Sequence, residues 1–223
     1  MRYSHARKGI GKLFAAEILQ LIVVIMMTVC TVLIAVFTSY GDSNTDTTNG
    51  MIILGLTIFG LLSGLLYIVA MLISLIGVIQ TSKDERSFKT VIYVIIVGAV
   101  AAVSITVADY LISEDTGALS GLSQVVSDMV NSITTILIIQ GINNIATELD
   151  NKQVFKKGES LFHLIIWIAL INISMRAVVL CIPKKVAVEA EIILTLIAAI
   201  LSIVQYFVYL SFLRKASKML KDQ

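Results

Sequence analysis

Six long apolar stretches dominate the sequence and restrict what the chain can fold into. They cover residues 13–39, 51–80, 89–112, 119–146, 160–182 and 187–213. Each is longer than the roughly 20 apolar residues with which a helix, rising about 1.5 Å per residue, crosses a hydrocarbon layer about 30 Å thick. The stretches predict an all-α, polytopic integral membrane protein with six transmembrane helices, forming a single transmembrane domain over 1–223.

The overall composition excludes the other broad classes. Hydrophobic residues make up 57% of the 223-residue chain and charged residues only 14%, whereas soluble domains carry about 25% charge. The same apolar excess excludes disorder. Two cysteines are too few for a disulfide scaffold. We therefore expect the lipid bilayer to be the main partner of the chain.

Basic residues are distributed unevenly between the two sides that six spans would define. Fourteen of the 17 Lys and Arg residues fall in 1–12, 81–89, 147–159 and 214–223, which all lie on one side. By the positive-inside rule this side is cytoplasmic, so both termini are predicted to be cytoplasmic. The basic face then follows from topology and anionic lipid, and it does not indicate nucleic-acid binding.

A weak internal repeat suggests how the spans are paired. Phe14, Phe88 and Phe162 are spaced by 74 residues, and each lies near the expected cytoplasmic start of an odd-numbered span. Duplication would give three tandem helical hairpins in the same orientation, but chance alignment in an apolar background explains the spacing equally well. The segments outside the spans are short, the longest being the first dozen residues and a cytoplasmic linker near 147–159.

Charged residues within the predicted spans are the first candidates for a functional site, because burying a charge in the bilayer costs about 2.5–3.5 kcal/mol on insertion scales. Asp128 is expected about 13 Å deep in the fourth span and Arg176 about 9 Å deep in the fifth, at about 1.5 Å per residue. Similar depth on consecutive helices predicts an ion pair. Such a pair either locks the bundle or lines a polar cavity. Asp109, near the outer end of the third span, is also explained by a position at the membrane surface.

Polar residues recur along one stripe of the fourth span. Gln124, Ser127, Asp128 and Asn131 follow three- and four-residue spacing, and the remaining circumference is aliphatic. A stripe of amides and hydroxyls facing lipid is costly, so it must face protein or water. Packing between helices and a pore lining explain it equally well. The candidate path for a small ion or polar solute therefore comprises six residues: Asp128, Arg176, Asn131, Ser127, Gln124 and Asp109.

Small residues predict where helices approach closely. The second span contains Gly60 and Gly64 in a small-xxx-small pattern, and the third contains Gly98 followed by Ala102. Such faces allow close packing of membrane helices. A contact within the chain is favoured over homodimerisation.

No pattern favours catalysis or a cofactor. His5 and His163 are the only histidines, too few for a histidine-based metal site. The chain has no zinc-protease, serine-hydrolase or nucleotide-binding motif. We therefore expect no catalytic residues, metal or cofactor.

Two functions remain open from the sequence. One is a small transporter or channel-like protein with a polar path along the fourth span. The other is a non-transporting accessory or regulatory subunit, which would pair with other membrane subunits in an unknown oligomeric state. The isoleucine-rich, proline-poor composition favours a bacterial plasma membrane.

Overall fold

A computed structural model describes residues 3–40, 46–112, 118–181 and 184–222, with side chains over 3–30, 54–108, 126–171 and 203–222 and at a few positions between. The described chain is all-helical. Its six helices are α1 (Ser4–Tyr40), α2 (Asp46–Thr81), α3 (Ser87–Ile112), α4 (Ala118–Glu148), α5 (Lys152–Cys181) and α6 (Lys184–Lys221).

Four helices contain described segments long and apolar enough to cross a membrane. These segments are Ser4–Cys30, Leu54–Thr81, Ser87–Ala108 and Val126–Glu148. Large aliphatic side chains such as Leu61 of α2 and Val97 of α3 are about two-thirds exposed, which is compatible with contact with a lipid bilayer. The chain therefore has the character of a membrane protein with several apolar helices.

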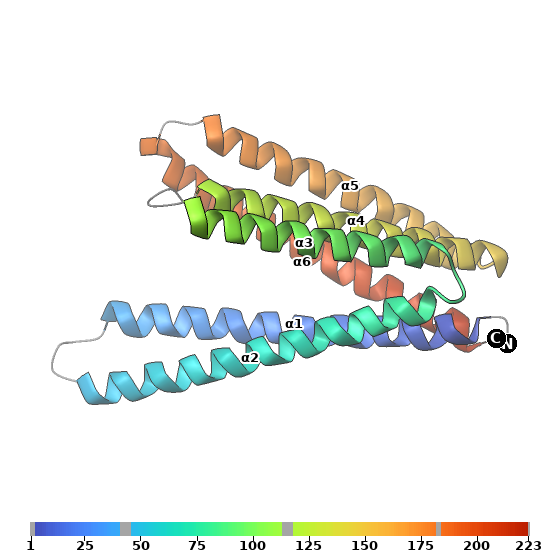
Figure 1. Ribbon diagram of the computed structural model, residues 1–223, viewed down its shortest axis with the longest axis horizontal. Helices are drawn as coiled ribbons and strands as arrows, with labels where there is room; N and C mark the ends of the chain where they lie inside the picture. Colours follow the sequence, from blue (N-terminus) through green and yellow to red (C-terminus); the bar gives the residue numbers. More distant parts are fainter. Residues whose placement is uncertain (1–2, 41–45, 113–117, 182–183, 223) are drawn as a thin grey trace.

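The main helix contacts run in a closed ring. Each helix packs against its neighbours in the chain, and α6 packs against α1. Successive helices run in opposite directions, so both chain termini lie at one end of the molecule, which we name the inner end (Figure 1). The C-terminal end of α1 lies at the opposite, outer end, where the pair of α1 and α2 diverges from α3, α4 and α5.

The α1–α2 pair has a seam of buried residues spaced by seven along each helix, most of them small. Ala16, Val23 and Cys30 of α1 are buried, as are Ser63 and Ala70 of α2. A seven-residue spacing keeps one stripe of an antiparallel helix pair in contact along its length. Farther toward the inner end, a Cβ added to Gly77 would lie 2.8 Å from the carbonyl oxygen of Gly9.

The expectation for Gly60 and Gly64 was wrong, because an added Cβ at either position meets nothing within 4 Å. Ser63 and Ala70, the α2 residues of the seam, lie on a neighbouring face of the helix. By contrast, Gly98 does lie at a close contact, since its added Cβ would meet Val130 of α4 at 2.5 Å.

The expected cytoplasmic linker near 147–159 is instead a tight turn followed by helix. Asp150 has a φ of 50°, and the N–H groups of Asp150 and Asn151 donate to the carbonyls of Thr147 and Ala146. This pattern ends α4 as a Schellman motif. Asn151 then caps α5 by accepting a hydrogen bond from the N–H of Val154 at 3.0 Å.

Among the residues whose side chains the structure describes, the hydrophobic core lies at the inner end. Its buried side chains come from both ends of the chain and from the turns that lie there. The N-terminal turns of α1 and the C-terminal turns of α6, expected to lie outside the spans, contribute Ala6, Ile10, Ala216 and Leu220, all at most 3% exposed. These segments are amphipathic helix extensions.

Candidate functional site

One face of α4 is polar in its outer half and apolar in its inner half. Asn131 precedes Ile138 and Ile145 by seven and fourteen residues, and Asp128 precedes Ile142 by fourteen. Seven residues make nearly two turns of a helix, so these side chains lie along one stripe. Since Ile138, Ile142 and Ile145 are at most 4% exposed, the polar stripe is the outward continuation of the face that α4 buries.

The polar half of this face is only partly covered. Asp128 and Asn131 are exposed, and Ser127, Thr134 and Thr135 are half-buried. The hydroxyl of Thr135 donates to the Asn131 carbonyl at 2.8 Å. The Thr134 hydroxyl oxygen is buried and has no hydrogen-bond partner among the described residues. An unsatisfied buried hydroxyl costs about 1–3 kcal/mol, so this position favours a polar neighbour.

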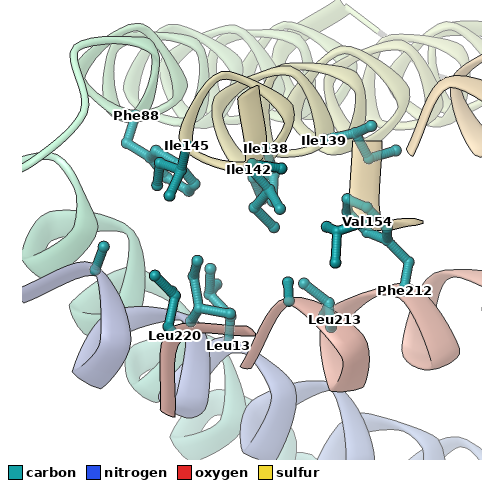
Figure 2. Packing of buried hydrophobic residues seen from close by; sticks show 14 of the residues in the cluster. Leu13, Phe88, Ile138, Ile139, Ile142, Ile145, Val154, Phe212, Leu213 and Leu220 are labelled. Carbon is teal, nitrogen blue, oxygen red and sulfur yellow. The ribbon is translucent and has the colours of Figure 1, made fainter. Parts of the chain in front are cut away.

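The inner half of the face is closed by aliphatic side chains. Figure 2 shows Ile138, Ile142 and Ile145 of α4 facing Leu13 of α1 and residues of α6. The facing residues belong to one buried cluster. We call the following six the inner apolar cluster: Leu13, Ile138, Ile142, Ile145, Leu213 and Leu220, each at most 4% exposed.

Hydrogen bonds tie the helix ends together around this cluster. Asp84, in the turn between α2 and α3, accepts a hydrogen bond from the N–H of Ala6 at 2.7 Å. This N–H is one of the donors that the first turn of a helix leaves without an intrahelical partner. The Tyr3 hydroxyl donates to the Glu148 carboxylate at the end of α4. The N-terminal turn of α1 is therefore bonded to both the α2–α3 turn and α4.

The same α2–α3 turn also binds α4 directly. The side-chain amide of Asn144 donates to a Glu85 carboxylate oxygen at 3.1 Å and to the Ser87 hydroxyl at 3.2 Å. The Ser87 hydroxyl donates in turn to Glu85 at 2.9 Å. These three residues thus connect α4 with the α2–α3 turn and with the start of α3, beside a region where α2 and α3 themselves make few contacts.

Positive charge is concentrated at this end as well. Lys157 of α5 donates a hydrogen bond to the Ser211 hydroxyl of α6 at 2.5 Å. Partial desolvation, with a smaller effect from the charge of Lys215, lowers the pKa of Lys157. Lysines on neighbouring helices therefore share one surface, which suits an anionic leaflet.

The structure brings three of the six predicted site residues onto one stripe. Ser127, Asp128 and Asn131 lie on the face of α4 defined above. Gln124, Asp109 and Arg176 lie within helices, but their side chains fall outside the described residues, so the predicted pair between Asp128 and Arg176 stays a prediction. Among the described residues, no three His, Cys, Asp or Glu side chains are grouped so that they could hold a metal ion.

The apolar continuation of the stripe was not predicted from the sequence. Thr134 and Thr135 are followed seven residues later by Gly141 and Ile142, so the shared face could have been found by extending the same spacing inward.

Comparisons of the chain with protein-family models, with curated proteins and with solved structures find no match.

Proposed function

We propose that this chain is a small transporter or channel-like membrane protein in which a small ion or polar solute moves along the polar face of α4. Asp128, Asn131, Ser127 and Gln124 line this path. Arg176 on α5 supplies a charged partner for Asp128, and Asp109 lies toward the outer mouth. No catalytic step is involved.

The proposal includes a membrane arrangement. The chain spans the plasma membrane six times as three helical hairpins within one domain, and the inner end faces the cytoplasm. The distribution of Lys and Arg and the shared end of the two termini (Figure 1) support this orientation.

One observation carries the functional proposal: the polar stripe lies on the face that α4 buries, and not on a face turned away from the other helices. A stripe on the inner side of a helix ring can contact water without exposing amides and carboxylates to lipid. Sealing by packing would require side chains over Asp128 and Asn131, which are exposed in the described structure.

Cysteine accessibility tests the path directly. With Cys30 and Cys181 replaced by Ala, Asn131→Cys is treated with a membrane-impermeant thiol reagent from the outer side. Met129→Cys is the matched control, because Met129 has a similar depth, is 47% exposed and lies on the opposite side of α4. A thiol in lipid stays protonated and unreactive. We expect rapid labelling at 131 and protection at 129.

Protection of both Asn131→Cys and Met129→Cys would contradict the proposed path. It would favour the second function, a non-transporting accessory or regulatory subunit. The outer half of α2 supports that alternative, because the open space beside Gly60 and Gly64 would allow another membrane helix to approach closely. Asp128 would then have a structural role.

A further inference from the structure

We infer that the inner apolar cluster is a closed gate at the inner end of the α4 path, and that hydrogen bonds from Tyr3 and the α2–α3 turn hold it shut. The inference rests on the proposed function, since a gate requires a path. It adds the place at which the path is closed and the contacts that regulate opening.

The chemistry of the cluster is that of a barrier to ions and polar solutes. Ile138, one heptad inward from Asn131, is the first of three isoleucines on the path-lining face. They meet Leu13 of α1 and Leu213 and Leu220 of α6 in the buried cluster. An apolar constriction of this kind blocks conduction by excluding water, because an ion cannot shed its hydration shell there without polar groups to replace it.

The barrier is assembled from helices that are not neighbours in the ring of main contacts. Within the ring of main contacts, α4 packs against α3 and α5, while Leu13 and Leu220 belong to the contacting pair α1 and α6. The cluster therefore lies between α4 on one side and α1 with α6 on the other. Separating these two sides by a few ångströms opens the cluster without breaking the α1–α2 seam.

Two sets of polar contacts oppose that separation. The Tyr3 hydroxyl joins the start of α1 to Glu148 of α4. Asp84 holds the N–H of Ala6, while Asn144 of α4 binds Glu85 in the same turn. The α1 end is thus bonded to α4 once directly and once through the α2–α3 turn. We call these contacts the latch.

Labelling from the inner side tests the gate and the latch together. The reporter is Thr135→Cys, one turn outward of the cluster, in the chain with Cys30→Ala and Cys181→Ala. A membrane-impermeant thiol reagent is applied to right-side-out and to inside-out vesicles. The latch variants are Tyr3→Phe, Asp84→Ala and their combination; Asp84→Ala removes the acceptor of the Ala6 N–H, and none of the variants changes a residue of the inner apolar cluster. Ser211→Ala is the matched control, because it removes a hydrogen bond at the same end, between α5 and α6.

We expect the reporter to react from the outer side and not from the inner side when the latch is intact. Each latch substitution should raise inner-side reactivity by roughly 2- to 10-fold, and the combination by more, because a hydrogen bond contributes a modest net stabilisation. Ser211→Ala should leave it unchanged.

The other outcomes separate this inference from the proposed function. If the Thr135→Cys reporter reacts from the inner side while the latch residues are unchanged, the cluster is not a closed gate. That result would overturn the inference and would not contradict the path. Outer-side reaction with no response to the latch variants would overturn the latch, and with it this inference. Absence of reaction from either side would contradict the proposed function itself.

Discussion

Single glycines decide how closely the first two helices approach. At Gly77 an added Cβ would meet the Gly9 carbonyl oxygen at 2.8 Å and the Leu13 backbone nitrogen at 3.1 Å. Backbone atoms within a helix cannot move aside as a flexible side chain can. The sequence predicts that small residues create close contacts, yet it points to the wrong pair, because Gly9 and Gly77 become neighbours only when the two helices pair.

Gly77→Ala should therefore destabilise the protein by about 1–3 kcal/mol, the cost of overpacking a close contact. Gly64→Ala is the control: it enters open space and gains helix propensity, so stability should stay constant or rise by up to about 1 kcal/mol. Thermal unfolding in detergent micelles measures both. Equal effects of the two substitutions would contradict the α1–α2 seam.

At the scale of elements, the helices extend beyond the predicted spans at their inner ends. The expected span 187–213 becomes the helix Lys184–Lys221, and the added turns bury Ala216, Met219 and Leu220. Hydropathy underestimates such segments, because Lys215 and Lys218 lower the average while the apolar residues keep to one face. The apolar span cores were predictable from length and hydropathy for four helices.

The last turns of α6 should accordingly contribute to stability. Leu220→Ala, at a residue 3% exposed, should cost about 2–5 kcal/mol through lost burial and the cavity that remains. Lys221→Ala, at the adjacent exposed position, should change the melting temperature little. If Leu220→Ala leaves the melting temperature unchanged, the last turns of α6 do not pack against the other helices in the membrane-embedded protein.

At the scale of the whole molecule, the basic residues and the described buried core both lie toward the end that holds the two termini. The end that holds both termini also holds the buried core and the polar ties between helices, and most basic residues fall in segments at this end. The sequence predicts the charge asymmetry. Which apolar residues form the described core at this end could not be predicted, since apolar residues facing lipid and those facing protein have the same composition.

Both termini should then react from the same side of the membrane. Ser4→Cys and Lys221→Cys are exposed positions. In a cysteine-free background we expect both to be protected in intact cells and labelled in inside-out vesicles. Labelling of only one of them in intact cells would require an odd number of spans, and would disprove the proposed arrangement.

The contact between α1 and α6 also orders the events of biosynthesis. The core combines Leu13, near the start of the chain, with Leu213 and Leu220 near its end. The pair of α1 and α2 can assemble from neighbouring sequence as it leaves the ribosome, because its seam needs no other helix. The core must wait until α6 has been synthesised and inserted. Until then, newly made chains lack the side chains of α6 that cover the apolar half of the α4 face.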